Sequence, residues 1–263
     1  MKLKYGFIIK ILTLAIILLL VACFVSSVML IIYGPRDGIF TPRKKVNETN
    51  NTSHAILTET HDFGQYYINN LVFLGDSTIA KMKDAGVLYE GSETTQIWSD
   101  ESGDLVLDFS IDKTAILFPK TQKAISITEA AAEKKPEYMV ITVGINNGVA
   151  YCSEDSFKEY YGKLIAVIKE ASPDTKIILQ SILPVSKKYE KETSGITQKK
   201  IDTANDWILA LAETHNVKFL DTASALKDSK GYLKSEYDSG NGLHLNETGY
   251  NVLLNYIRTH GYK

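Results

Sequence analysis

Three polar residues that follow or border apolar stretches have the types needed for acyl transfer. Ser77 ends a Gly-Asp-Ser tripeptide directly after the apolar run 71–74, so its hydroxyl could stand at the carboxyl end of a strand. Serine is a weak nucleophile at neutral pH and requires an adjacent base, usually histidine, whose pKa lies near the working pH. Of the five histidines, only His244 lies in a glycine-bounded loop before a final helix. Asn146 follows the run 138–143, and its amide could stabilise an oxyanion at the same edge.

Each of these residues also has a purely structural interpretation. Ser77 could be a helix N-cap, a position that serine often fills. His244 could be an exposed loop histidine, and Asn146 precedes Asn147-Gly148, a dipeptide typical of a turn with positive φ. The chemical interpretation therefore depends on the three side chains meeting at one edge of the fold.

Apolar runs alternate with helical patterns along the chain, which predicts an α/β fold with a parallel sheet covered on both faces. One segment fits less well. Residues 105–118 contain two apolar runs around a polar centre and could form an inserted hairpin, either for substrate contacts or as structural decoration. The expected strands are 71–74, 94–98, 138–143, 176–182 and 217–220, and the expected helices are 78–85, 127–135, 155–171, 201–215 and 248–258.

These motifs resemble the SGNH, or GDSL, hydrolase family over about residues 71–256. The first block is Gly75-Asp76-Ser77, the third is Gly144-Ile145-Asn146-Asn147, and the last is Asn241-Gly242-Leu243-His244. Their order and spacing agree with the family. The resemblance implies a three-layer α/β/α sandwich, the flavodoxin-like SGNH hydrolase fold, with a five-stranded parallel sheet.

The resemblance also implies the role of each residue. Ser77 would be the nucleophile and His244 its base. The oxyanion hole would be formed by the Ser77 N–H, the Asn146 amide and a glycine N–H from the second block, for which we choose Gly103, with Gly91 as the alternative. Such an acyl-serine route requires no metal or cofactor.

Two positions depart from the family pattern. Asn147 replaces an aspartate of the third block, where we expect little effect on the chemistry. Asn241 replaces the acid of the catalytic triad, and a neutral amide cannot stabilise an imidazolium as a carboxylate does. His244 could be oriented by the Asn241 oxygen or a backbone carbonyl, Asp238 could take over as the acid, or the domain could bind acylated glycans without cleaving them.

The predicted function is that of an extracytoplasmic serine esterase, a carboxylic ester hydrolase acting on an acylated carbohydrate or a small ester. Acetyl groups on a cell-envelope carbohydrate are the expected target. An O-acyltransferase would use the same acyl-enzyme with a sugar hydroxyl in place of water. A catalytically impaired glycan-binding domain is the alternative that Asn241 favours.

The start of the chain has the pattern of a membrane anchor. The run 11–33 carries no charge and is long enough to cross a hydrocarbon core of roughly 30 Å as a helix. It follows a short basic segment at 1–10, which is typical of an uncleaved signal-anchor with the rest of the chain outside. A cleaved signal peptide and a lipoprotein signal ending at Cys23 are alternatives. We expect a polar tether at 34–66 and the hydrolase domain at 67–263.

Charge and cysteine content restrict the partners further. The net charge of −2 gives no reason to expect nucleic acid. With Cys23 inside the apolar run, Cys152 has no partner in the outer domain, which excludes a disulfide framework. We therefore expect a single-pass bacterial membrane protein whose catalytic domain is extracytoplasmic and is held together by its core.

Overall fold

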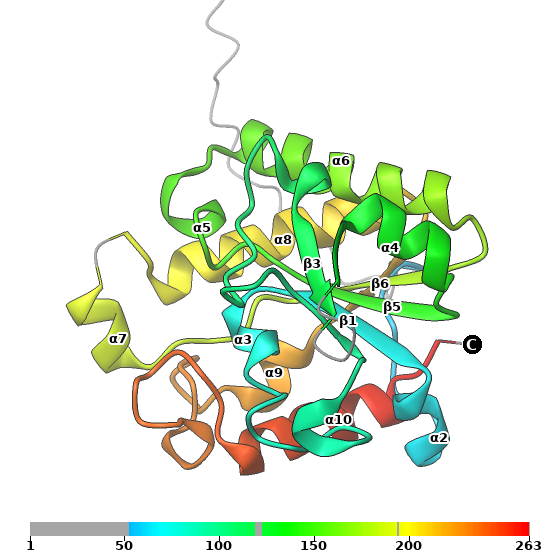
Figure 1. The fold of residues 1–263 in the computed structure, drawn as a ribbon. Helices are drawn as coiled ribbons and strands as arrows, with labels where there is room; N and C mark the ends of the chain where they lie inside the picture. Colours follow the sequence, from blue (N-terminus) through cyan, green and yellow to red (C-terminus); the bar gives the residue numbers. More distant parts are fainter. Residues whose placement is uncertain (1–52, 119–122, 194, 263) are drawn as a thin grey trace, which may run out of the picture. The chain divides into compact units, whose positions relative to one another are not determined.

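The computed structural model describes residues 53–118, 123–193 and 195–262, and these residues fold around one parallel sheet (Figure 1). The sheet has the strand order β2-β1-β5-β6-β7, and each neighbouring pair is parallel. The expected α/β fold with a five-stranded parallel sheet is confirmed. The strands are β1 (Leu71–Gly75), β2 (Ile97–Trp98), β5 (Tyr138–Thr142), β6 (Lys176–Gln180) and β7 (Lys218–Leu220).

Alternate residues of the central strands are buried on opposite faces of the sheet. Met139 and Ile141 of β5 belong to one apolar cluster and Val140 to the other, which explains why this strand is apolar throughout. Figure 1 shows α6 and α8 over one face and α10 over the opposite face. The first cluster packs under α4 (Ile127–Lys134), α6 (Glu154–Ala171) and α8 (Gln198–Thr214); the second packs under α2 (Gly64–Asn69), α3 (Ser77–Ala80), α9 (Thr222–Leu226) and α10 (Glu247–Thr259).

The hairpin expected within 105–118 is wrong in its pairing. Strand β3 (Ala115–Phe118) pairs in antiparallel fashion with β4 (Lys123–Ser126), not with residues 105–107. Leu107 instead bonds to the loop after β5: its N–H donates to Asn146 O at 3.4 Å, and its carbonyl accepts from Asn147 Nδ2 at 2.8 Å. The apolar Leu105 and Leu107 are buried under that loop, so their hydrophobicity reflects packing rather than a strand.

The elements around β2 are shorter than the sequence predicts. Residues 94–96 of the expected strand 94–98 do not belong to β2. They follow the 3-10 helix η1 (Gly91–Glu93), and Thr94 Oγ1 accepts the Gln96 N–H at 3.2 Å. The helix after β1 ends at Ala80 and continues as turns. The remaining elements are η2 (Ile111–Lys113), α5 (Gly148–Tyr151), α7 (Lys187–Glu192) and η3 (Ser235–Tyr237).

The domain begins earlier than the expected boundary at residue 67. The described residues from 53 onward belong to one compact unit, and Ala55 and Leu57 are buried in it. The Leu57 N–H donates to Phe219 O at 2.8 Å, and the Phe219 N–H donates to Ala55 O at 2.8 Å, so this segment extends the sheet beside β7. Residues 53–66 therefore belong to the fold and not to a tether. The stretch Ala55–Leu57 covers the edge of the sheet. It is short and lies between polar residues, so its sequence does not indicate a strand.

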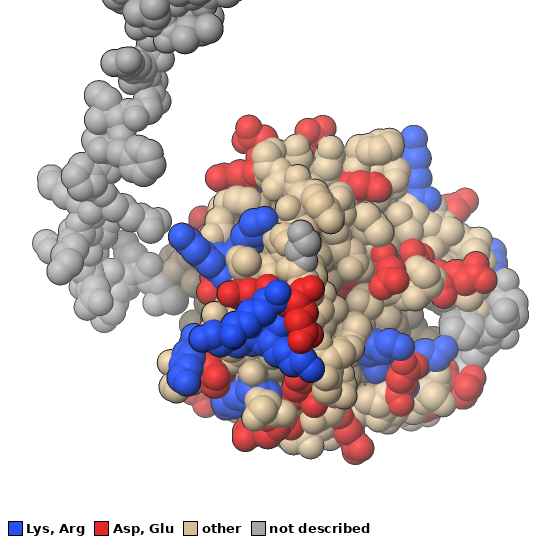
Figure 2. Space-filling model, turned by 90° about the vertical axis from the view of Figure 1, so that its left-hand side faces the viewer, with Lys and Arg blue, Asp and Glu red and all other residues tan. Residues whose placement is uncertain are grey.

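The expected anchor at 11–33, and the tether up to residue 52, lie outside the described residues. Among the helices within 53–118, 123–193 and 195–262, none is both long and apolar enough to cross a membrane. Figure 2 views the side of the domain on which α7 lies in Figure 1, and there Lys and Arg side chains lie next to Asp and Glu.

Candidate active site

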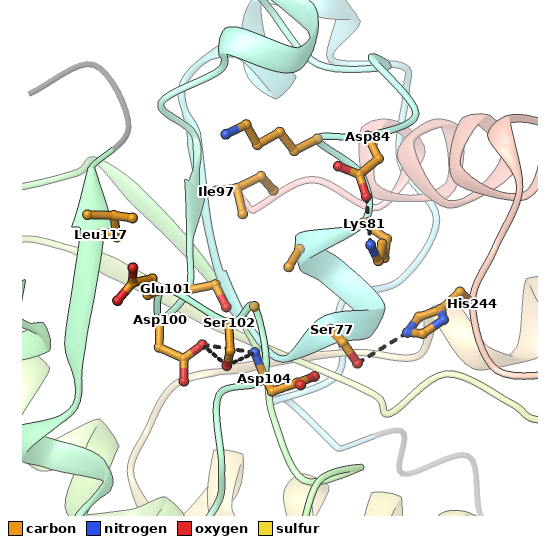
Figure 3. Close-up of a pocket in the computed structure, with 14 residues that line it drawn as sticks. Ser77, Lys81, Asp84, Ile97, Asp100, Glu101, Ser102, Asp104, Leu117 and His244 are labelled. Atoms are coloured by element: carbon orange, nitrogen blue, oxygen red, sulfur yellow. Dashed lines mark hydrogen bonds and ion pairs between the residues drawn. The ribbon is translucent and has the colours of Figure 1, made fainter. Parts of the chain in front are cut away.

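The structure brings Ser77 and His244 together at the carboxyl edge of the sheet. Ser77 follows β1, and His244 lies in the loop before α10. His244 Nε2 and Ser77 Oγ are 3.2 Å apart, although 167 positions separate the two residues in the chain (Figure 3). This distance is hydrogen-bond reach for a nucleophile and its base.

The N-cap interpretation of Ser77 does not hold, because Asp76 caps α3. Asp76 Oδ1 accepts the Thr78 N–H at 3.1 Å and the Thr78 hydroxyl at 2.6 Å, and Oδ2 accepts the Ile145 N–H at 3.3 Å. Burial raises the pKa of the Asp76 carboxyl to about 6, against the hydrogen bonds from Thr78 that lower it. Asp76 thus joins the loops after β1 and β5 and leaves the Ser77 hydroxyl to face His244.

Glycine is required where these two loops approach each other. A Cβ at Gly75 would lie 2.8 Å from Thr142 O of β5 and 2.8 Å from Ile79 Cβ of α3. Gly144 has φ +128°, and a Cβ there would lie 2.9 Å from Ile182 Cδ1. The glycines of the first and third blocks therefore let α3 begin directly against the end of β5.

Asn146 carries the buried polar donor expected of an oxyanion hole. Its Nδ2 is buried and has no hydrogen-bond partner among the described residues. The preceding Ile145 N–H is bonded to Asp76, which brings the Asn146 backbone to the loop that carries Ser77. The turn interpretation holds as well, because Asn147 has φ 65°. Buried polar groups in native proteins are nearly always hydrogen-bonded, so an unpartnered buried amide indicates a role in binding or catalysis.

Asn241 is the residue that contacts the second ring nitrogen of His244. Asn241 Nδ2 lies 2.7 Å from His244 Nδ1. The orientation of the amide follows from its other bonds, because Asn241 Oδ1 accepts the backbone N–H of Leu243 at 3.0 Å and of His244 at 2.9 Å. Reversing the amide would set its NH₂ group against these two donors.

This orientation fixes the tautomer of the histidine. Because Nδ2 is a donor, Nδ1 must accept, so the ring proton of neutral His244 lies on Nε2, facing Ser77. A base must have Nε2 free to accept the serine proton, so the resting state is the unproductive tautomer. Burial and Lys81 lower the pKa of His244, while Asp104 and Asp238 raise it. The net shift is downward from the ordinary value of 6.5, which favours the neutral ring.

The structure does not place the Asp238 carboxylate on His244 Nδ1, which corrects the expectation that it takes over as the acid. Asp238 Oδ1 accepts the N–H groups of Gly240 and Gly242, both at 2.8 Å, and so shapes the loop. Gly242 has φ +78°, and a Cβ there would overlap Ser186 Oγ. Asp238 is an organiser of the histidine loop, and its charge reaches His244 only through space.

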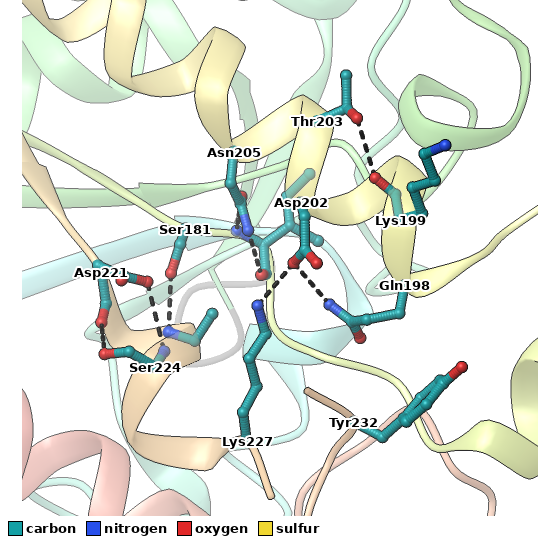
Figure 4. A network of polar contacts seen from close by, with 12 residues as sticks. Ser181, Gln198, Lys199, Asp202, Thr203, Asn205, Asp221, Ser224, Lys227 and Tyr232 are labelled. Atoms are coloured by element: carbon teal, nitrogen blue, oxygen red, sulfur yellow. Dashed lines mark hydrogen bonds and ion pairs between the residues drawn. The ribbon is translucent and has the colours of Figure 1, made fainter. Parts of the chain in front are cut away.

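Polar side chains of α8 support the loop that carries His244 through the segment after β6. Asn205 Oδ1 accepts the Ile182 N–H at 2.7 Å, and Asp202 Oδ1 binds Lys227 Nζ at 2.6 Å (Figure 4). The bond from Asn205, together with Gln198 Oε1, which accepts the Val185 N–H at 3.0 Å, holds the segment after β6. In that segment the Ser186 N–H donates to Gly242 O at 2.8 Å. The position of His244 is therefore set by α8 as well as by its own loop.

Ser77 and His244 open into a cavity of about 490 Å³. Gly103 lines this cavity and has φ +78°, but its N–H donates to Asp100 O at 3.1 Å within a turn. That donor is thus engaged in the structure. The alternative, Gly91, donates its N–H to Leu88 O at 2.9 Å in the turn that leads into η1. The structure does not supply a free second-block glycine donor from either position.

Sequence reasoning missed the charged lining of the cavity. Lys81 and Asp84 come from the turns after α3, and Asp100, Glu101 and Asp104 come from the loop after β2. The signal for it in the sequence is the acidic run around Gly103. In the part of the chain that the structure describes, no cluster of three or more His, Cys, Asp or Glu residues could hold a metal ion.

A serine bonded to a histidine at the carboxyl edge of a parallel sheet is the arrangement of serine hydrolases on α/β folds. The family model of the GDSL-like lipase/acylhydrolase family matches residues 73–252, and the chain belongs to this family. A proposed acylhydrolase from Bacteroides fragilis NCTC 9343 is 18% identical, with 72% of this chain and 84% of that chain covered and a TM-score of 0.51. A GDSL-like lipase from Bacteroides thetaiotaomicron VPI-5482 is also 18% identical, with 72% and 85% covered and a TM-score of 0.51. Both likenesses concern the fold, and no curated protein matches the chain.

Proposed function

We propose that this protein is a serine esterase that cleaves carboxylic esters through an acyl-serine intermediate. The observation that carries the proposal is the 3.2 Å contact between Ser77 Oγ and His244 Nε2 at the mouth of a cavity. The unpartnered Nδ2 of Asn146 supports it, because this donor suits the oxyanion of a tetrahedral intermediate.

The proposed cycle needs four proton transfers at His244, two in acylation and two in deacylation. Ser77 Oγ bonds to the ester carbonyl carbon as His244 Nε2 takes the hydroxyl proton, and the same nitrogen returns that proton to the leaving alcohol as the C–O bond breaks. Water then attacks the acyl-serine and gives its proton to Nε2, and the acid leaves as Oγ regains a proton. Asn146 Nδ2 and the Ser77 N–H donate to the oxyanion. Gly103 would join them only after its N–H leaves Asp100 O.

Asn241 makes this cycle slow, because the reaction requires the other tautomer. To place a proton on Nδ1 and free Nε2, the amide must turn so that Oδ1 accepts from His244 Nδ1. That rotation breaks the two backbone hydrogen bonds to Oδ1. The same observation favours the second candidate, a domain that binds acylated glycans without turnover.

The substrate and location belong to the proposal as well. The apolar run 11–33 supports anchoring in the cell membrane with the catalytic domain outside. An extracytoplasmic esterase would meet the envelope, and we propose acetylated envelope carbohydrate as its target. A phosphatase fused after residue 263 tests the orientation: activity outside the cell is expected, and activity confined to the cytoplasm would contradict it.

The test of turnover uses the full chain in detergent. Wild type should hydrolyse p-nitrophenyl acetate slowly, Ser77→Ala should not, and a fluorophosphonate should label wild type at Ser77. Ser229→Ala, at an exposed serine in the loop after α9, serves as the matched control. If wild type and Ser77→Ala are equally inert and no label appears, the esterase proposal fails. Retained binding of an acetylated glycan in that case would identify the binding domain instead.

A further inference from the structure

The cavity beside Ser77 has two differently charged walls. One wall comes from the turns after α3 and carries Lys81, Lys83 and Asp84, and the other is the loop from Asp100 to Asp104 (Figure 3). Lys81 Nζ and Asp84 Oδ2 form an ion pair at 2.8 Å, so their charges largely cancel.

The loop from Asp100 to Asp104 leaves a negative excess in the cavity. Asp100 Oδ1 accepts the Ser102 hydroxyl at 2.8 Å and the Asp104 N–H at 2.9 Å, and so fixes the loop. The carboxylates of Glu101 and Asp104 make no hydrogen bond or ion pair to another described residue, and both residues line the cavity. Against these three carboxylates, Lys83 is the one remaining cation among the described lining residues.

Asp104 is the residue of this loop whose charge acts on His244. Figure 3 shows its side chain among the residues that line the cavity together with Ser77. Its charge also acts on His244 and on Lys81, since it raises the pKa of both groups. A positive group held by Asp104 would therefore lie in the same cavity as the ester that Ser77 attacks.

Ser99 provides an independent sign that this wall receives a ligand. Ser99 lines the same cavity, is 6% exposed, and its Oγ has no hydrogen-bond partner among the described residues. A buried hydroxyl with an unused lone pair is an acceptor for an N–H donor. Ser99 lies between β2 and the acidic loop, so the serine and the carboxylates of that loop line the same cavity.

We propose that this site is selective for esters that carry an ammonium group near the ester bond, with Asp104 and Glu101 as the residues that select the charge. This inference rests on the proposed esterase function and names its substrate class. A partly enclosed cleft with an excess of one charge concentrates ligands of the opposite charge. An ammonium group also supplies the positive partner that the two unpaired carboxylates lack. A primary ammonium does so through N–H donors, and a quaternary one through its charge alone.

The experiment compares esters that differ only in charge. Acetylcholine is compared with 3,3-dimethylbutyl acetate, in which carbon replaces the quaternary nitrogen, and alanine methyl ester is compared with methyl isobutyrate. The first pair places the cation on the alcohol and the second on the acyl group. An ammonium group also makes an ester chemically more reactive, whichever protein cleaves it. The readout is therefore the change, from wild type to each variant, in the ratio of kcat/KM for the cationic ester to kcat/KM for the neutral one.

We expect Asp104→Asn and Glu101→Gln each to lower this ratio about fivefold in at least one pair, the scale of a partly exposed ion pair. Added NaCl should lower the ratio in wild type but less in the double variant. Glu159→Gln, an exposed carboxylate on α6, is the matched control and should leave the ratio unchanged.

The outcomes separate the two proposals. If the neutral esters are hydrolysed in a Ser77-dependent manner and the ratio is the same in all variants, the charge selectivity is wrong and the esterase stands. If none of the four esters is hydrolysed and Ser77 is not labelled, both proposals fail. A ratio that falls in Asp104→Asn but not in Glu159→Gln supports the selectivity, and the pair in which it falls tells where the cation lies.

Discussion

Asn241→Asp should convert the resting site into the productive one. A carboxylate at this position can accept the backbone N–H groups of Leu243 and His244 with one oxygen, as Asn241 Oδ1 does. Its other oxygen would then replace the Nδ2 that lies 2.7 Å from His244 Nδ1. An acceptor there requires a proton on Nδ1 and leaves Nε2 free to accept the proton of Ser77.

The size of the gain follows from what the amide must lose to reach the same state. Turning the Asn241 side chain breaks two exposed hydrogen bonds, at about 1 kcal/mol each, or about 2 kcal/mol in total. At about 1.4 kcal/mol per tenfold, this is a gain of about 30-fold. The new carboxylate also stabilises the imidazolium, and in serine proteases the reverse change costs about 10⁴ in rate. We expect a rise in kcat of between about 30-fold and 10⁴-fold.

The pH profile gives a second, independent readout. In wild type, burial and Lys81 hold the pKa of His244 below its ordinary value of 6.5. The base works only when neutral, so activity should be lost as pH falls through a midpoint below 6.5. A carboxylate beside Nδ1 favours the charged ring, and in Asn241→Asp the midpoint should move upward.

Nitrogen NMR of the histidine ring tests the reasoning directly. Wild type should carry the proton of neutral His244 on Nε2, and Asn241→Asp should carry it on Nδ1. Asn251→Asp, the same chemical change on the exposed side of α10, controls for the added charge and should leave both activity and tautomer unchanged. A wild-type ring protonated on Nδ1, or a correctly folded Asn241→Asp with no gain in rate, would refute the argument.

Three further expectations concern the same edge of the sheet. Ser77→Ala should abolish hydrolysis but change the unfolding free energy by less than about 1 kcal/mol, because Asp76 caps α3; a large loss in urea denaturation would contradict this. Asn146→Ala should lower kcat by about 10²-fold with little change in KM, as measured by steady-state kinetics, and a pure KM effect would exclude an oxyanion role. The folded state binds the Asp76 proton at higher pH than the unfolded state. As pH falls from about 6 towards 3.8, wild type should therefore gain up to about 3 kcal/mol relative to Asp76→Asn in urea unfolding, and a pH-independent difference would contradict the raised pKa.

The sheet could be predicted from sequence because its strands are buried on both faces. Residues 138–143 are apolar without interruption, and such a run has few alternatives to a central strand. The segment 105–107 is also apolar, but it is fixed by a side chain distant in sequence, because Asn147 Nδ2 donates to the Leu107 carbonyl. Ala55 and Leu57 likewise join β7 through residues far along the chain. Local pattern carries no information on such partners.

The residues of the candidate site could be predicted, but the direction of their hydrogen bonds could not. Ser77 and His244 were expected to meet because both lie at the ends of elements on one sheet edge. Whether Asn241 presents its oxygen or its nitrogen to His244 depends on the N–H groups of residues 243 and 244, which the loop conformation sets. The N–H of Gly103, which was expected to be free, likewise donates to the Asp100 carbonyl in a turn. The Asp100 side chain also fixes this loop.

The missing carboxylate makes the remaining charges around His244 matter for catalysis. Asp104 raises the pKa of His244, so its carboxylate also stabilises the imidazolium that forms when Ser77 attacks. If it supplies part of what Asn241 lacks, Asp104→Asn should lower kcat for a neutral ester more in wild type than in the Asn241→Asp background. A double-mutant cycle on 3,3-dimethylbutyl acetate should give a coupling of about 0.5 kcal/mol or more. Strict additivity would mean that Asp104 acts on the substrate alone and that the histidine works without help from the acidic loop.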